Sequence, residues 1–212
     1  MIQQGTIEWR MQRCGKLGAS KVGEVLARTK SGWGASRANI RAMLVAERLT
    51  GTPQETFVNA AMQWGTDTEA QARAAYEFHC DIDVALAAFI DHPRIAMSGC
   101  SPDGLVGDKG LVEIKCPNTS THIDALLDQD DKGKYRSQVQ WQMAVTGRNW
   151  CDWVSFDPRL PAHMQLFVRR VQRDDAYIMD IEREVAIFLD EVSETVEKLR
   201  KLYQPGQMEA AE

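Results

Sequence analysis

The chain has 212 residues, of which 44% are hydrophobic and 26% are charged, and its formal net charge is −5 at pH 7. These values are typical of a folded globular protein and exclude a largely disordered chain, and no apolar run approaches the ~18 residues of a membrane span. The five cysteines are widely spaced without a CxxC pair, which argues against a disulfide framework or a zinc site. The first residues also lack a signal-peptide pattern, so we expect a cytoplasmic protein.

Three helices are predicted in the first 80 residues. The first starts at residues 18–20, the second is capped by Ser36 and ends at Thr50 before Gly51, and the third covers 58–79 with a bend or interruption near 64–66. A basic, glycine-containing loop at 29–34 separates the first two. The inner side of the second helix is expected to carry Ile40, Met43, Leu44 and Leu49.

Strand patterns begin at residue 81. We expect three or four short strands over 81–117, helices over 119–128 and 134–147, strands over 150–156 and 164–171, and one long amphipathic helix over 174–203. This order predicts a mixed central sheet flanked by helices, an α/β or α+β fold. We expect a single domain over 1–212, with a helical, basic part (1–80), a sheet core (81–171) and a C-terminal helix (174–203).

The charges are distributed unevenly along this chain. Residues 1–50 contain nine Lys and Arg against three Glu, a balance of +6, whereas residues 172–212 contain five against eleven acidic residues, a balance of −6. This asymmetry indicates either a basic surface opposite an acidic one or two ordinary solvated helix faces. Net charge alone therefore does not decide whether the partner is a nucleic acid.

The strongest chemical signal is a set of three polar side chains. Asp103 lies in a Ser-Pro-Asp-Gly sequence, and Glu113 and Lys115 follow in Glu-Ile-Lys. Side chains at i and i+2 of a strand share one face, so Glu113 and Lys115 project together. A hairpin turn at 108–110 would bring Asp103 beside them. By itself, this pattern is also typical of a surface hairpin with an ordinary Glu/Lys pair.

Two carboxylates at this spacing predict a metal site. Close carboxylates repel each other and are costly to bury unless a cation lies between them, and oxygen ligands favour a hard ion such as Mg²⁺. Such an ion polarises a phosphate and lowers the pKa of a bound water, while Lys115 would orient the water or stabilise developing charge. The residues therefore predict metal-assisted hydrolysis of a phosphate ester.

These residues resemble the PD-(D/E)xK nuclease motif, and further stretches resemble its lambda-exonuclease (YqaJ-type) branch of viral recombination nucleases. The similar stretches follow the family order between about residues 9 and 159; they are 17–20, 64–69, 100–105, 113–117, 138–140 and 157–159. The resemblance implies a restriction-endonuclease-like core. It also implies that Asp103, Glu113 and the Ile114 carbonyl bind metal, and that Lys115 is the catalytic lysine.

The resemblance adds two supporting residues and the cofactor. Glu69 would support the metal site, and Gln138 would position the water or the phosphate; otherwise both would be ordinary polar residues on a helix surface. The expected cofactor is Mg²⁺, with Mn²⁺ as the alternative, bound as a pair of ions in each active site.

The basic N-terminal part resembles the family's pocket for a 5′-phosphate, which uses an arginine, a serine and a second basic residue. Arg13, Ser20 and Lys30 occupy these places, and Arg28 is a substitute for Lys30, where lambda exonuclease has an arginine. A helix that begins near Ser20 would direct free N–H groups at an anion. A lysine offers a point charge instead of a bidentate fork, so the pocket would be looser.

Two apolar residues are candidates for contacts with bases. Trp33 lies between two glycines in the basic loop and could stack on an unpaired base. Met62 aligns with an apolar family residue that is suited to wedging between DNA strands. On sequence alone, Met62 also fits a helix core.

The resemblance implies a Mg²⁺-dependent 5′→3′ exonuclease that digests linear double-stranded DNA to 5′-mononucleotides and leaves a 3′ overhang for recombination by strand annealing. It implies a homotrimeric ring around DNA, a single-strand annealing protein as partner, and a phage or prophage gene expressed in bacterial cytoplasm. The alternatives are an endonuclease or single-strand-specific enzyme of the same superfamily, a non-catalytic DNA-end-binding subunit, and a phosphatase of small substrates.

Overall fold

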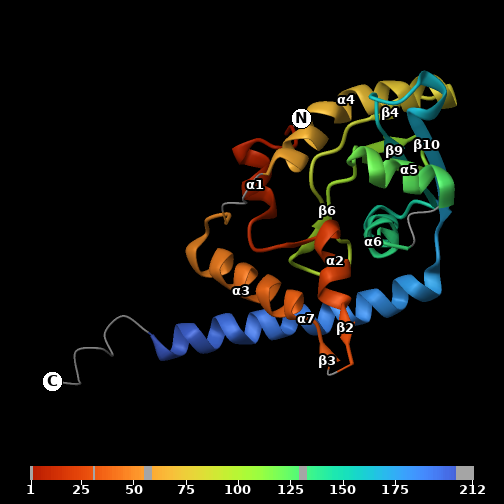
Figure 1. Ribbon diagram of the computed structural model, residues 1–212. Coiled ribbons are helices and arrows are strands. Elements are labelled where there is room, and N and C mark those ends of the chain that lie inside the picture. The colour runs from red at the N-terminus through yellow and green to blue at the C-terminus, as the bar shows by residue number, and fades with distance from the viewer. Residues whose placement is uncertain (1, 31, 55–58, 129–132, 204–212) are drawn as a thin grey trace.

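The computed structural model describes residues 2–30, 32–54, 59–128 and 133–203 (Figure 1). Ser31 and Val58, which belong to the predicted loop 29–34 and helix 58–79, lie outside these ranges. The N-terminal elements are α1 (Ile7–Arg13), β1 (Leu17–Gly18), α2 (Ala19–Leu26), β2 (Arg28–Thr29), β3 (Gly32–Trp33), α3 (Ala35–Thr50) and α4 (Ala60–Cys80).

The remaining elements follow in the predicted order. They are β4 (Val84–Ala85), β5 (Ile90–Asp91), β6 (Ser98–Cys100), β7 (Gly104–Val106), β8 (Gly110–Lys115), α5 (Thr119–Asp128), α6 (Arg136–Thr146), β9 (Trp150–Phe156), a 3₁₀ turn at Ala162–Met164, β10 (Leu166–Gln172) and α7 (Asp175–Leu202). In the described part of the chain, no helix is long and apolar enough to cross a membrane.

The larger sheet has the strand order β10-β9-β8-β7-β4, in which β8 and β9 are parallel and the other pairs are antiparallel. Val112 and Ile114 face apolar residues of α4, whereas Leu111 packs with Val139 and Met143 of α6. Because side chains alternate along a strand, Glu113 and Lys115 share the α6 side with Leu111. The predicted mixed sheet flanked by helices is confirmed.

A second layer joins the two ends of the chain. The small sheet β1-β6-β5 and helices α2, α3 and α6 pack around the apolar face of α7, which crosses below α2 and α3 in the view of Figure 1. Arg37 is buried and pairs with Glu191 at 2.7 Å, and Arg28 lies 3.5 Å from Glu184. The basic N-terminal part and the acidic C-terminal helix therefore neutralise each other in part.

Several predicted boundaries are wrong. Residues 81–117 contain five strands instead of three or four, and Met164 belongs to the 3₁₀ turn that precedes β10. Gly34 is the N-cap of α3, because the Ser36 hydroxyl donates to the Glu24 carbonyl at 2.8 Å and is not available to cap its own helix. Leu49 is exposed, so it does not belong to the inner side of α3.

Helix α4 is continuous, so the predicted interruption near residue 65 is wrong. Gly65 faces open space, and a glycine inside a helix costs only about 1 kcal/mol relative to alanine. The helix is anchored beyond this point by Thr68, Ala72 and Tyr76, which are buried. It thus reaches from its exposed first turn at Met62 to the edge of the larger sheet.

Candidate active site

The β7–β8 hairpin brings the predicted carboxylates together. Gly104 pairs with Val112, and Asp103 Oδ2 accepts a hydrogen bond from the backbone N–H of Ile114 at 2.7 Å. The hairpin requires glycine at 104, because a Cβ there would lie 2.1 Å from a methyl carbon of Val84. The predicted fold-back of Asp103 onto the Glu-Ile-Lys strand is confirmed.

Glu113 is buried and is held by three donors. Its Oε1 accepts hydrogen bonds from the Lys115 ammonium and, at 2.5 Å, from the Gln138 amide, and its Oε2 accepts one from the Gln142 amide at 2.6 Å. Glu113 and Lys115 point from one strand, as their i, i+2 spacing predicts. Both carboxylate oxygens are therefore fixed in place by α6 and by Lys115.

The electrostatics of the site follow from burial and from the paired carboxylates. Burial raises the pKa of Asp103 well above its usual value, and the nearby Glu113 carboxylate raises it further. Burial lowers the pKa of Lys115, but the Glu113 and Asp103 carboxylates raise it more, so its net shift is upward. The two carboxylates therefore favour the charged form of Lys115, which donates hydrogen bonds.

Glu69 lies on the helix that packs against the other face of β8. Burial raises its pKa, the paired Arg73 guanidinium at 3.4 Å lowers it, and the Glu113 carboxylate raises it again. Its charge also raises the pKa of Asp103. Glu69 is thus close enough to the paired carboxylates to interact with them electrostatically.

Gln142 is a site residue that the sequence analysis missed. It lies one helical turn after Gln138, and residues four apart share a face of a helix. That spacing was a readable signal, since both glutamines reach the same carboxylate from α6. The Gln142 Oε1 atom is buried without a hydrogen-bond partner among the described residues.

The donor set fits a hard divalent cation. Within the described residues no group of three or more His, Cys, Asp or Glu side chains is placed to hold a metal. The carboxylates of Asp103 and Glu113, together with a backbone carbonyl such as that of Ile114, could hold one. Burial is the largest cause of the raised pKa of Asp103, and the Glu113 carboxylate raises it further. A bound cation would compensate the second of these causes.

The segment after β9 connects α4 to the end of β8. Asp157 is buried and accepts from Arg159 through both oxygens, at 2.7 and 2.9 Å. The Arg159 guanidinium also donates to the Pro117 carbonyl and lies 4.5 Å from the centroid of Trp64. Arg159 therefore links α4, which carries Glu69, to the residues that follow β8.

The structure brings two of the predicted phosphate ligands together at one end of α2. Ser20 lies exposed in the first turn of α2. The Arg13 guanidinium lies against Gly18, the N-cap residue of α2, because a Cβ placed on Gly18 would be 3.1 Å from one of its nitrogens. Burial lowers the pKa of Arg13, and Glu47 raises it. Lys30 belongs to the β2–β3 hairpin, which follows the opposite end of α2, as Figure 1 shows.

The two predicted base contacts have different surroundings. Trp33 lies between the guanidinium groups of Arg28, 3.7 Å from the ring centroid, and Arg37, at 4.0 Å. Two groups so close to one centroid must cover opposite faces of the ring, so a base could stack there only if Arg28 moved away. Met62 is 49% exposed, so it does not belong to a helix core.

Together, a mixed sheet that carries an aspartate, a glutamate and a lysine on its central hairpin defines a nuclease of the PD-(D/E)xK fold. Residues 8–149 match the YqaJ-like viral recombinase domain, and the chain belongs to that family. Membership implies dependence on a divalent metal ion.

Solved structures agree with this assignment. The alkaline exonuclease LHK-Exo from Laribacter hongkongensis is 51% identical, with a TM-score of 0.86 and coverage of 92% of this chain and 97% of that one. The same enzyme in complex with dAMP gives a TM-score of 0.87. A phage-related exonuclease from Haemophilus somnus 129PT shares the fold at 15% identity, with a TM-score of 0.71 over 87% of this chain and 96% of that one. No curated protein matches significantly.

Gln142→Leu is expected to weaken divalent-metal binding and to slow DNA hydrolysis by about 10- to 100-fold, as is usual when a group that orients a metal ligand is removed. Isothermal titration calorimetry with Mg²⁺ and single-turnover rates would measure the two effects. Gln140→Leu is the matched control, because buried Gln140 on the same helix contacts the Gln172 carbonyl and the Asp174 N–H instead. Equal metal affinity in both variants would contradict a role for Gln142.

Proposed function

We propose that the protein is a Mg²⁺-dependent 5′→3′ exonuclease that digests linear double-stranded DNA to 5′-mononucleotides and leaves a 3′ single strand for recombination by annealing. The observation that carries the proposal is the fixed arrangement of Asp103, Glu113 and Lys115 on one hairpin. Its support is membership of the family and the likeness to LHK-Exo, which is named an alkaline exonuclease.

The roles of the residues follow from their positions. Asp103, Glu113 and the Ile114 carbonyl would hold the metal, which supplies charge neutralisation and an acidified water when bound. Lys115, a cation held against Glu113, would donate to the phosphate oxygens or to the leaving 3′ oxygen as negative charge develops. Gln138 and Gln142 would keep Glu113 in position, and Glu69 would adjust the charge of the site.

End dependence tests this proposal against the other nucleases of the superfamily. Linear and covalently closed circular duplexes of the same sequence would be incubated with Mg²⁺, and the products would be separated by chromatography. The proposal predicts 5′-mononucleotides from the linear form and an intact circle. Nicking of the circle would identify an endonuclease, and binding without cleavage of either form would identify an end-binding subunit.

Arg13→Ala is expected to remove the preference for 5′-phosphorylated over 5′-hydroxyl ends, since it deletes the guanidinium beside the N-terminus of α2. The measurement is the ratio of initial rates on the two substrates. Arg10→Ala provides the control, because Arg10 is an exposed residue of the same short helix. A ratio in Arg13→Ala that equals the wild-type ratio would refute the pocket.

We also propose that the protein works as a homotrimeric ring with a single-strand annealing protein. A closed cyclic ring requires two different complementary surfaces on each protomer. It would let an acidic chain enclose DNA, with basic side chains of the N-terminal part directed at the channel. Sedimentation equilibrium at micromolar concentration should give three times the mass of one chain, and a monomer mass would contradict the ring.

A further inference from the structure

The carboxylate of Glu47 joins two segments that lie on either side of α3 in the sequence. Glu47 lies near the end of α3 and is only 8% exposed. Its Oε2 accepts a hydrogen bond from the Gly15 N–H at 2.7 Å, and its Oε1 accepts one from the Gln54 N–H at 3.0 Å. Both oxygens of this buried carboxylate are therefore used to hold backbone.

Arg48, the next residue, holds the other side of the same turn. Its Nε donates to the Gly15 carbonyl at 2.9 Å, and a terminal nitrogen donates to the Ser193 hydroxyl of α7 at 3.0 Å. Gly15 has a left-handed φ of +71°, and a Cβ there would lie 2.8 Å from Arg48 Cγ, so the turn requires glycine. Figure 1 shows α3 between α1 and α7. Glu47 and Arg48, which we call the Gly15 clamp, thus fix both polar backbone groups of one residue.

The turn that the clamp fixes carries Arg13 and leads into α2. The Lys16 N–H donates to the Arg13 carbonyl at 2.9 Å, so the backbone from 13 to 16 forms one closed turn. The Arg13 guanidinium stacks on Trp9, 4.0 Å from the ring centroid, and in the described part of the chain no carboxylate forms an ion pair with it. Its position therefore depends on the turn and on the Trp9 ring, and its donors are available to an anion from outside.

The charge of Glu47 acts on Arg13 in addition to the hydrogen bonds. Burial lowers the pKa of the Arg13 guanidinium, and the Glu47 carboxylate raises it. Because the two groups are not in direct contact, Glu47 favours the charged form of Arg13 without occupying the donors that a phosphate would use.

We propose that Glu47 is a positioning residue for recognition of the 5′-phosphate. By clamping the turn at Gly15, it sets the place of the Arg13 guanidinium relative to the backbone N–H groups at the start of α2. This inference rests on the proposed 5′-phosphate pocket and adds to it a residue that does not touch the DNA. A shift of about 1 Å at a distance from the chemistry can cost on the order of 10²-fold in rate, so a residue of this kind matters to end recognition.

The test measures how much the phosphate contributes to binding when the clamp is altered. Dissociation constants of duplexes with 5′-phosphate or 5′-hydroxyl ends would be measured in EDTA, where no cleavage occurs, and their ratio isolates the contribution of the phosphate. Glu47→Gln replaces one acceptor oxygen by an amide donor that faces a backbone N–H. We expect the preference for the phosphorylated end to fall by about tenfold, the equivalent of one charge-assisted hydrogen bond.

Glu77→Gln is the matched control. Glu77 on α4 also accepts a hydrogen bond from a backbone N–H, that of Val84 at 2.8 Å, and this contact is remote from Arg13. Glu77→Gln should lose thermal stability and keep the wild-type preference, so the preference distinguishes positioning from a merely structural role. In an Arg13→Ala background, Glu47→Gln should leave the preference unchanged, because the guanidinium that it positions is absent.

Arg48→Met tests the same turn from its carbonyl side. The substitution keeps an apolar stem and removes the hydrogen bond to the Gly15 carbonyl, so it should also lower the preference. It decides the question if thermal denaturation shows that Glu47→Gln does not fold.

A wild-type preference in folded Glu47→Gln would overturn the inference, as would a wild-type preference in Arg48→Met where Glu47→Gln does not fold. Arg13→Ala is measured in parallel. Loss of the preference in Arg13→Ala, with the preference retained in Glu47→Gln, rejects the clamp alone. A preference retained in Arg13→Ala rejects the proposed pocket and the clamp with it.

Discussion

Lys115→Ala is expected to lower the rate of DNA hydrolysis by about 10²- to 10³-fold, the usual effect of removing one group that stabilises transition-state charge. The reason is geometric, because the Lys115 ammonium is held against Glu113 on the face of the hairpin where the phosphate would lie. Affinity for DNA should change little, since one cation among many contacts is lost. Single-turnover rates and gel-shift titrations in EDTA measure the two quantities.

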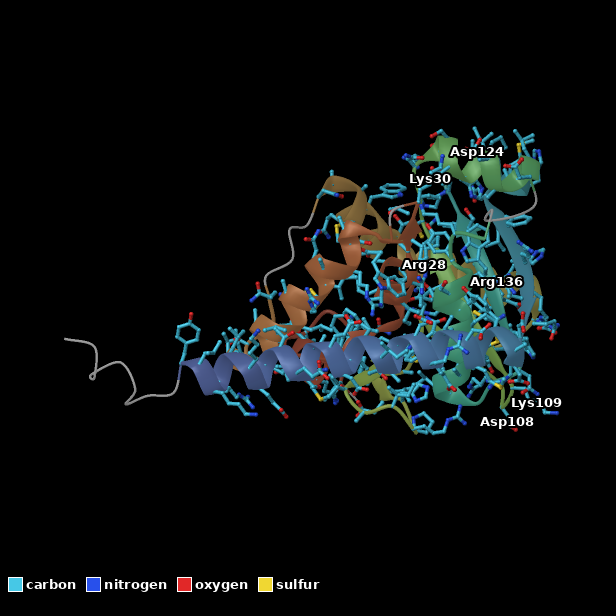
Figure 2. The ribbon with its side chains drawn as sticks, turned by 90° about the horizontal axis from the view of Figure 1, so that it is seen from below. Arg28, Lys30, Asp108, Lys109, Asp124 and Arg136 are labelled. Carbon is cyan, nitrogen blue, oxygen red and sulfur yellow. The ribbon has the colours of Figure 1, made fainter. Side chains whose placement is uncertain are left out.

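Lys109→Ala is the control for this variant. Lys109 lies exposed in the turn of the β7–β8 hairpin and is labelled in Figure 2. The substitution therefore removes the same charge from the same hairpin, at a distance from the carboxylates. Its rate should match the wild type. A Lys115→Ala enzyme that hydrolyses DNA at the Lys109→Ala rate would exclude the lysine from the chemistry.

Glu113→Gln is expected to abolish measurable Mg²⁺ binding and to reduce hydrolysis by at least the same 10²- to 10³-fold. The substitution removes one of two carboxylates, and it turns one acceptor oxygen into an amide donor that faces Lys115, Gln138 or Gln142. A buried donor opposite another donor costs roughly 1–3 kcal/mol, so thermal stability should also fall. Calorimetric titration with Mg²⁺ is the direct measurement.

Asp108→Asn is its control, since Asp108 is an exposed carboxylate in the same hairpin turn. It removes an equal charge without touching the site and should bind Mg²⁺ like the wild type. Retained Mg²⁺ affinity in folded Glu113→Gln would show that the metal is held elsewhere.

Local patterns predicted the catalytic hairpin well. The i, i+2 spacing of Glu113 and Lys115 fixes a common strand face, and the turn sequence at 108–110 returns the chain so that Asp103 meets the Ile114 N–H. Both signals depend on a few neighbouring residues. Contacts with distant parts of the chain therefore do not change the structure that they predict.

Long-range packing explains what local patterns missed. The Gln142 amide reaches Glu113 because α6 packs on that face of β8. Its spacing from Gln138 indicates a shared helix face, but it does not indicate which strand that face meets. Likewise, the loop around Trp33 looked like a free basic surface, but Arg37 is drawn onto α7 by Glu191 and Arg28 covers the ring. The Arg37–Glu191 pair joins residues that are 154 positions apart in the sequence.

Helix α4 shows a local signal that tertiary contacts override. The Trp64-Gly65-Thr66 sequence suggested a break, yet buried Thr68, Ala72 and Tyr76 hold the following turns against the sheet. The Tyr76 hydroxyl donates to Asp152 Oδ2 at 2.7 Å, and burial followed by this contact raises the pKa of the phenol. The helix is therefore set by packing on β9 and not by its weakest residue.

The most direct test of the central claim is digestion of a linear duplex that carries a 5′-phosphate on one end only, with a different label on each strand, in Mg²⁺ or in EDTA. We expect metal-dependent shortening of the phosphorylated strand from its 5′ end, with the complementary strand left intact. Cleavage that persists in EDTA, internal cuts in both strands, or shortening from the 3′ end would each contradict a metal-dependent 5′→3′ exonuclease.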